Sequence, residues 1–302
     1  MATTIVPNRH LIAAPPVGER RYGLFDAATL LDTLPDRWAA AGVQFPELDC
    51  GGPVLEYDAT CGTAPVKAFT EGTGFTGGDP YWIYSALRCG TVGTTAAEIA
   101  DRVRRRLGSG EQTAVENVVW NGGLFGNDPA LTTSGAVVVT PLAPGAGAAL
   151  AAIEARFYAE YGYRGVLHVN TQAHAALNDY VDRSGGAGVL TTELGTRVSY
   201  GAGYGIDGPG AEPPAAGFVW AFMTAPVTVA RGPVIQPNVV ATMNRTNNQW
   251  NALAERVYLH YWACDVVYAV QIPVAAPAFT TAPAVPPAPV IGEVTETVEE
   301  NV

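Results

Sequence analysis

The stretch that decides the fold is Thr95–Trp120, TAAEIADRVRRRLGSGEQTAVENVVW. Thr95 precedes Glu98 by three positions, and this pair predicts a capping box that satisfies backbone amides at a helix start. Apolar residues then recur every four positions, at Ile99, Val103 and Leu107. Since this spacing places them on one helix face, the segment predicts an amphipathic helix, roughly 40 Å long for about 25 residues.

Charged residues are expected on the polar faces of this helix: Arg102, Arg104, Arg105, Arg106, Glu111 and Glu116. Gly108 and Gly110 each cost roughly 1 kcal/mol relative to alanine inside a helix, so the sequence favours a bend near Ser109. Two shorter stacked helices are the alternative.

The composition indicates a folded protein that does not read nucleic acid. The chain has 302 residues, of which 48% are hydrophobic and 15% charged, enough for a core in one large or two smaller domains. It carries a net charge of −11 and one lysine, Lys67, whereas phosphate affinity comes from clustered Lys and Arg. The basic run Arg102–Arg106 is expected to pair with carboxylates of a neighbouring element or subunit, with a phosphate-facing role as the alternative.

Sequence motifs for catalysis are missing. The chain has no HExxH, GxSxG, GxxxxGK[ST] or CxxC pattern, so we expect no metal, no cofactor and no turnover enzyme. No apolar run reaches 18 residues, and the start lacks the pattern of a secretory signal. These features predict a cytoplasmic origin without a membrane partner.

The segments before the long helix have little core of their own. In residues 1–45, FDAATLLDTL predicts a short helix that ends before Pro35. In residues 46–80, the strand-like pieces VLEYDAT and VKAFTE lie among Gly and Pro, which predicts a long two-stranded hairpin. Because an isolated hairpin is marginal in water, it requires another surface to pack on.

The segments after the long helix predict a small mixed sheet covered by helices. AVVVT (136–140) is expected to be a buried strand, residues 148–161 a helix capped by Gly162, and GVLHV (165–169) a strand. NTQAHAALNDYV is expected to form a helix with Asn170 or Thr171 at its N-cap. Further strands are predicted in 190–204, 218–230 and the apolar stretch before Pro273, after which the Pro-rich sequence is extended.

This order of segments resembles the Hong Kong 97 capsid fold of tailed-bacteriophage major capsid proteins, which encapsulins share. In Ala97–Gly123, EQTAVENVVWNGG is similar to the Glu-containing end of the family's spine helix before a Gly turn. In Ala254–Val270, AERVYLHYWACDVVYAV is similar to a closing strand region in which an ER pair precedes aromatics. The resemblance covers residues from about 20 to 273.

The resemblance implies an α+β fold in six parts. They are an N-terminal arm (1–45), an extended β-hairpin loop with its return strand (46–92), a peripheral domain with the spine helix (93–145), an axial domain (146–235), a peripheral return (236–273) and a Pro-rich C-terminal extension (274–302). With about 20 residues before the first similar segment, no large cleaved scaffolding segment is expected within the chain.

The resemblance also implies a structural role. Hexamers and pentamers of one chain would close into an icosahedral shell around packaged double-stranded DNA, without sequence-specific binding. The protein would be made and assembled in the host cytoplasm and reside in the virion, with scaffold, portal and decoration proteins as candidate partners. An encapsulin-type nanocompartment shell is the first alternative. A small soluble α+β enzyme using Cys89 or Cys264 with a histidine is the second.

A further implication concerns covalent crosslinking, since some family members join a Lys of the extended loop to an Asn of a neighbour with the help of a Glu. The favoured residues here are Lys67, Asn248 and Glu255. The sequence departs from the family pattern by one position, since a gapless match places Asn247 opposite the usual Asn and Ala254 opposite the usual Glu, so Asn247 is the other candidate amide. A desolvated, neutral Lys67 amine would attack the carboxamide, ammonia would leave and the carboxylate would take a proton. Alternatively, Lys67 is a solvated hairpin charge and the asparagines are turn residues.

Overall fold

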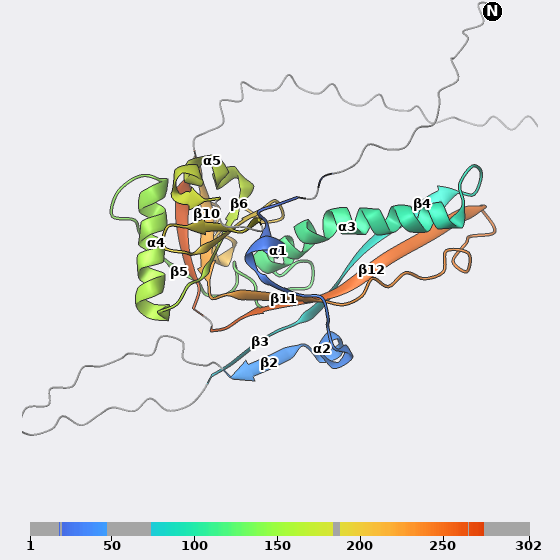
Figure 1. Cartoon of the computed structure of the whole chain (residues 1–302), viewed down its shortest axis with the longest axis horizontal. Helices are drawn as coiled ribbons and strands as arrows, with labels where there is room; N and C mark the ends of the chain where they lie inside the picture. Colours follow the sequence, from blue (N-terminus) through green and yellow to red (C-terminus); the bar gives the residue numbers. More distant parts are fainter. Residues whose placement is uncertain (1–17, 19, 47–73, 184–187, 265, 275–302) are drawn as a thin grey trace, which may run out of the picture.

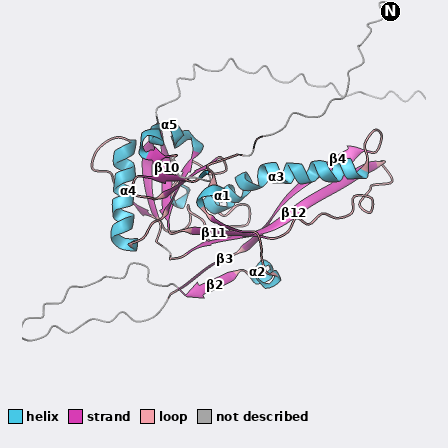
Figure 2. Cartoon of the chain, in the orientation of Figure 1, coloured by secondary structure: helices cyan, strands magenta, loops and turns pink. Residues whose placement is uncertain are grey.

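The structure is a computed structural model that describes residues 18, 20–46, 74–183, 188–264 and 266–274 (Figure 1). A compact body built on a seven-stranded sheet lies at one end, and a long helix over a strand ribbon extends from it (Figure 2). The α+β class predicted from the sequence is confirmed. None of the helices in the described part of the chain has the length and apolar character needed to cross a bilayer.

The long helix is α3 (Ala96–Asn121), and it is continuous. Thr95 Oγ1 accepts a hydrogen bond from Glu98 N at 3.2 Å, and Glu98 Oε2 accepts one from Thr95 N at 2.8 Å, so the predicted capping box forms. The helix ends at Gly122, whose φ of 78° is the left-handed conformation that glycine adopts most easily.

The alternative of two stacked helices is wrong, because burial outweighs the two glycines. Ile99, Val103 and Leu107 are at most 2% exposed, and burying each contributes about 1.5–3 kcal/mol. Gly108 and Gly110 together cost roughly 2 kcal/mol. The three apolar side chains pack on Ala252 and Ala254 of the sheet below and hold the helix to it in one piece.

The sheet under α3 has the order β1-β11-β12-β4, formed by β1 (Thr29–Leu31), β11 (Val227–Arg231), β12 (Gln249–Trp262) and β4 (Pro80–Gly90). β12 and β4 pair antiparallel from Gln249↔Gly90 to Leu259↔Pro80, which makes the long ribbon of Figure 1, and β4 is its edge strand. Side chains alternate between faces along a strand, so Ile83 and Leu87 pack toward α3 while Trp82 and Tyr84 are exposed.

The second sheet has the order β5-β13-β10-β6-β9-β8-β7. Its strands are β5 (Val137–Val138), β13 (Tyr268–Pro273), β10 (Phe218–Thr224), β6 (Val166–Asn170), β9 (Arg197–Gly201), β8 (Leu190–Thr192) and β7 (Val181–Asp182). Helix α4 (Ala146–Tyr161), capped by Gly162 as predicted, packs on β13 and β10. Its residues Ile153 and Phe157 are fully buried in the main core.

Short elements complete the described chain. They are α1 (Leu24–Ala27), α2 (Asp36–Ala41), the antiparallel pair β2 (Val43–Pro46) and β3 (Phe75–Gly78), and the helical turns η1 (Thr171–Ala173), α5 (His174–Leu177), η2 (Asn178–Tyr180) and η4 (Pro209–Ala211).

Three local predictions differ from the structure. FDAATLLDTL forms only the four-residue α1, because Thr29–Leu31 pairs in parallel with β11 instead of continuing the helix. AVVVT is not a buried strand: Val137 and Val138 are 52% and 53% exposed at the sheet edge, where only β13 pairs with them. NTQAHAALNDYV divides into η1, α5 and η2, although Asn170 caps it as predicted by accepting from Gln172 N at 3.0 Å.

Two strands depart from the predicted division of the chain. β11 belongs to the segment 146–235 but pairs with β12 in the sheet under α3. β13 belongs to the segment 236–273 but pairs with β10 in the seven-stranded sheet. The apolar sequence of a strand indicates that the strand is buried, but it does not indicate which sheet the strand joins. The predicted hairpin pieces VLEYDAT and VKAFTE lie outside the described residues.

Candidate functional site: the contacts of the long helix and the exposed apolar surfaces

The predicted crosslinking residues lie far apart where the structure describes them. Asn247 and Asn248 are exposed in the turn before β12, at the ribbon tip, where Asn248 O accepts from Thr91 N at 3.1 Å. Glu255 is half-buried in the middle of β12, opposite Tyr84. Lys67 lies outside the described residues.

Seven positions of extended chain separate Asn248 from Glu255, which is roughly 23 Å at about 3.3 Å per residue. One subunit therefore does not bring this amide and this carboxylate together. Any shared chemistry requires the carboxylate of a different copy.

The structure instead gathers polar contacts around Glu116 of α3, which is completely buried. Arg20 Nη2 donates to both of its carboxylate oxygens, at 2.6 and 2.8 Å. The backbone amides of Leu24 and Gly203 donate at 3.1 and 2.9 Å, and Gln112 Nε2 donates at 3.1 Å. Arg20 and Leu24 belong to the N-terminal segment, and Gly203 follows β9. One carboxylate thus joins the N-terminal segment, the long helix and the seven-stranded sheet.

The local sequence fits this close approach. A Cβ at Gly203 would lie 1.9 Å from the carbonyl oxygen of Thr113 in α3, so no other residue allows the loop to reach Glu116 without a shift of backbone. The pair is also partly shielded from water, because the Arg20 side chain is only 31% exposed. Hydrogen bonds to a charged acceptor are shorter and stronger than those between neutral groups.

A second carboxylate of α3, Glu111, joins the helix to the sheet below it. Arg256 Nη1 and Tyr258 OH donate to Glu111 Oε2 at 2.9 and 2.6 Å. Arg231 of β11 lies 3.6 Å from Glu111 Oε1 and pairs with Asp32 at 2.6 Å. Glu111 and Glu116 therefore connect α3 to both sheets.

Glu116 was predicted on a polar face of the helix, and this prediction is wrong because the side chain is fully buried. The last two turns of the predicted helix are apolar on nearly every side, because they carry Val115, Val118, Val119 and Trp120. A helix that is apolar all round is buried, so a lone carboxylate there requires partners. That signal identifies Glu116 as buried, but it does not identify Arg20.

Two histidines are buried in hydrogen-bonded networks. Thr224 Oγ1 donates to Ala225 O at 2.8 Å, so it accepts from His168 Nε2 at 3.0 Å, and His168 Nδ1 accepts from Tyr204 OH at 2.9 Å. His260 Nε2 donates to Pro129 O at 2.7 Å, which leaves Nδ1 to accept from Tyr81 OH at 3.1 Å. Both rings are satisfied as neutral donors and acceptors, and both are fully buried.

Burial lowers the pKa of His168 to about 3 and the pKa of His260 to about 4. The groups of three or more His, Cys, Asp or Glu side chains that a metal site needs do not occur among the described residues. The two histidines are accordingly structural donors and acceptors of the core.

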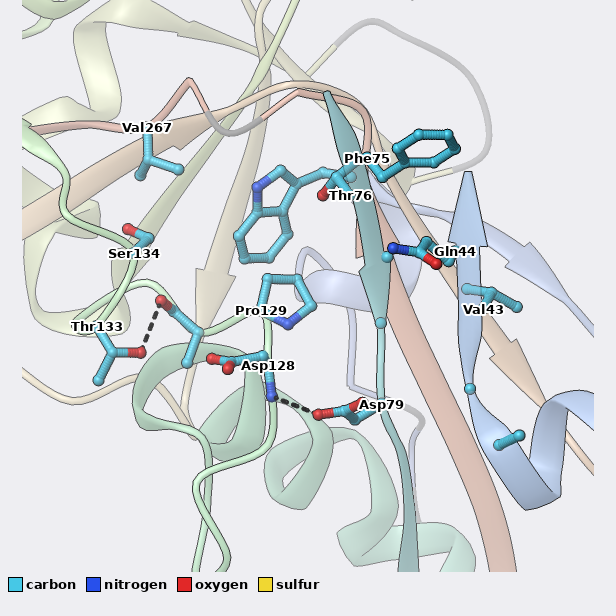
Figure 3. A pocket seen from close by; sticks show the side chains of 16 residues that line it. Val43, Gln44, Phe75, Thr76, Asp79, Asp128, Pro129, Thr133, Ser134 and Val267 are labelled. Atoms are coloured by element: carbon cyan, nitrogen blue, oxygen red, sulfur yellow. Dashed lines mark hydrogen bonds between the residues drawn. The ribbon is translucent and has the colours of Figure 1, made fainter. Parts of the chain in front are cut away.

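A groove of about 720 Å³ lies between the β2–β3 pair and the loop after α3 (Figure 3). Asp79 N donates to Asp128 O at 2.9 Å, and Asp128 N lies 3.5 Å from Asp79 Oδ2, so the loop is tied to the chain entering β4. Among the described residues of its wall there is no His, Cys or Lys. The charged groups among the described residues of the wall are the carboxylates of Asp79 and Asp128.

Two pairs of neighbouring residues are among the large apolar side chains that are exposed in the described part of the chain. Leu124 and Phe125 are 96% and 89% exposed, on the turn that follows α3. Trp82 and Tyr84 are 50% and 67% exposed, on the ribbon face away from α3. Exposed apolar groups of this size are typical of protein interaction surfaces.

Substitution of Glu116 by Gln tests whether its carboxylate holds the N-terminal segment, α3 and the loop after β9 together. The Gln amide would point N–H groups at donors that now meet a carboxylate, so we expect the free energy of unfolding in urea to fall by about 2–3 kcal/mol. Trypsin should also cleave near Arg20 and Arg21 faster. The matched control is Glu193→Gln at an exposed position, and equal stability of the two variants would contradict the assignment.

The buried histidines predict a pH dependence of stability. Their pKa values in the fold lie below the ordinary value of 6.5, so the unfolded chain binds more protons between pH 6.5 and about 4. Stability should be fully present above pH 6.5 and should fall by roughly 1 kcal/mol per pH unit per histidine below it. Urea unfolding from pH 7 to pH 5 measures this slope. His168→Gln should reduce it, whereas His174→Gln, at an exposed position, should not, and unchanged slopes in both would refute the prediction.

No protein-family model matches the chain, and none of the curated proteins matches it. Solved structures do. A structure from Gordonia phage Cozz has 13% sequence identity and a TM-score of 0.53, and the match covers 90% of this chain and 92% of that one. The capsid of an empty GTA particle has 11% identity and a TM-score of 0.53, covering 89% and 96%. A structure from Microbacterium phage Oxtober96 has 12% identity and the same TM-score of 0.53, with the same coverage as the GTA capsid.

Proposed function

We propose that this chain, which has the fold of phage capsid structures, is a major capsid protein that assembles with copies of itself into an icosahedral shell. The observation that carries the proposal is structural similarity over about nine-tenths of the chain, including to the capsid of a GTA particle. Low sequence identity limits that similarity to the fold, so the function also rests on the surfaces of this chain.

Those surfaces support an assembly subunit. The exposed pairs Leu124 with Phe125 and Trp82 with Tyr84 belong to different elements and are not covered by described residues of the same chain. Contacts between different patches of neighbouring copies are heterologous, and they form closed rings when the rotation from copy to copy closes. Hexameric and pentameric rings of one chain are the units we propose for the shell.

The finer parts of the proposal concern contents and partners. The shell encloses double-stranded DNA without reading its sequence, and it is assembled in the host cytoplasm with a scaffold, a portal and decoration proteins as candidate partners. The net charge of −11 supports a container that does not hold its DNA tightly. The alternative of a nanocompartment with a protein cargo has no observation in its favour here, and neither has a small soluble enzyme.

Electron microscopy of the natively expressed, purified protein tests the proposal. We expect closed icosahedral shells, and nuclease-protected DNA inside shells taken from virions. Small oligomers that never close under any solution condition would overturn the capsid function. Shells filled with protein and free of DNA would favour the nanocompartment.

Covalent crosslinking remains part of the proposal. The Lys67 amine of one copy attacks the side-chain carboxamide of Asn248, or of Asn247, in a second copy. Glu255 takes a proton from the attacking amine and delivers it to the carboxamide nitrogen, so that the new amide bond forms as the old C–N bond breaks and ammonia leaves. Because Asn248 and Glu255 lie roughly 23 Å apart on one strand, the carboxylate comes from another copy than the amide.

A denaturing gel of mature shells measures this reaction directly. We expect a ladder of linked subunits that Lys67→Ala and Glu255→Gln both abolish, whereas Glu193→Gln leaves it intact. Copies that migrate only as monomers would exclude the crosslink, without bearing on the shell itself. A ladder that survives Lys67→Ala would assign the bond to other residues.

A further inference from the structure

The exposed side of α3 carries a concentration of positive charge. Four of the chain's 17 Lys and Arg residues fall within the five positions 102–106. Arg104 lies 3.9 Å from Asp101 and donates to Gln236 at 2.8 Å. The guanidinium groups of Arg102, Arg105 and Arg106 are exposed and form no ion pair with any described residue. The expectation that this run pairs with carboxylates of a neighbouring element therefore holds for none of these three within the described chain.

The nearby acidic groups do not neutralise these three arginines. Glu98 is held in the capping box by Thr95, whose backbone amide donates to it at 2.8 Å. Asp101 faces Arg104, and Glu111 is engaged by Arg256 and Tyr258. Three cations remain available on a chain whose overall charge is strongly negative.

The helix surface next to these arginines is unusually smooth. Gly108 and Gly110 have ordinary helical backbone, and a Cβ added at either would meet no atom within 4 Å. Nothing within the described chain therefore requires glycine there, although each costs roughly 1 kcal/mol relative to alanine. Gly108 and Ser109 leave a low surface one turn from Arg105, which allows a broad partner to approach the helix closely. Gly110 lies on the ribbon side of α3, beside Leu107 and Glu111.

We propose that this arginine face, formed by Arg102, Arg105, Arg106, Gly108 and Ser109, contacts the phosphate backbone of duplex DNA. Its three charges span about 6 Å of helix at 1.5 Å per residue. Along one strand, duplex DNA presents roughly two phosphates over the same length, at about 3.4 Å of helix axis per phosphate. The planar guanidinium fork also matches phosphate oxygens in pairs. Sequence plays no part, because backbone contacts carry no base information.

The location of the surface within a shell rests on the proposed function: this face of α3 lines the interior. The phosphate contact itself does not depend on assembly. Because the net charge of −11 repels DNA at long range, the contact is weak in dilute solution and becomes saturated only where DNA is densely packed.

The experiment measures binding of the full-length purified protein to a short, fluorescently labelled DNA duplex by anisotropy, over a range of salt concentrations. Simultaneous Arg102→Gln, Arg105→Gln and Arg106→Gln should weaken binding at every salt concentration and remove about 2–3 from the slope of log K against log salt. The same three positions changed to Lys should retain most of the binding. The matched control changes Arg21, Arg37 and Arg164 to Gln, which removes the same charge from exposed positions elsewhere and should preserve the slope.

Each outcome either supports or overturns the proposed contact between these arginines and DNA phosphates. Equal loss in the arginine-face variant and the control would overturn the inference, because binding would then follow net charge alone. A variant that binds DNA normally but no longer forms shells would also overturn it and assign the arginines to contacts between copies. Loss of DNA binding with shells still forming supports it, and loss of DNA binding in a protein that never forms shells supports the phosphate contact while refuting the capsid function.

Discussion

The arrangement of this molecule depends on a negative charge buried in the last third of a helix. Glu116 has no access to water, and an ionised carboxylate in such a place is strongly unfavourable unless its oxygens are fully bonded. Five donated hydrogen bonds from four residues meet that requirement. Since the donors come from the N-terminal segment, the helix itself and the loop after β9, satisfying one side chain fixes three parts of the chain relative to each other.

Helix α3 is consequently a rigid connection between two sheets. At its C-terminal part, Glu116 holds the body built on the seven-stranded sheet. One and a half turns earlier, Glu111 holds β11 and β12 through Arg231, Arg256 and Tyr258. The N-terminal half rests on the ribbon through apolar contacts and is also held by hydrogen bonds to Gln236, which donates to Ala100 O at 2.7 Å and accepts from Arg104 at 2.8 Å.

The features that could be predicted from the sequence are those that depend on residues close together in the chain. The capping box at Thr95, the cap at Gly162 and the apolar stripe of Ile99, Val103 and Leu107 depend on neighbours in the chain, and all three are in the structure. Predictions from local sequence were wrong where a residue distant in the chain determines the structure. Thr29–Leu31 lies in a segment predicted to be helical, but it forms a strand because it pairs with β11. Arg20 gave no signal at all, because its partner is nearly a hundred positions away.

The candidate site was predictable to a similar extent. The basic run 102–106 was visible in the sequence, but only the structure separates Arg104, which has partners, from its three neighbours, which have none in the described chain. Asn248 and Glu255 matched a family pattern, yet the extended geometry of β12 sets them far apart. Linear spacing becomes distance only once the type of element is known.

The edge position of β4 has a consequence for a free copy of the protein. Within the described part of the chain its eleven residues pair with β12 on one side only, and a long open edge is a template on which an extended chain can add a strand. Proteins that keep such edges usually protect them with bulges, charges or prolines, whereas β4 has its proline only at the start and one charge, Arg88, near its end, with Trp82 and Tyr84 exposed between them. For the proposed capsid subunit, rapid assembly would bury this edge before other chains pair with it, and slow assembly would favour aggregates.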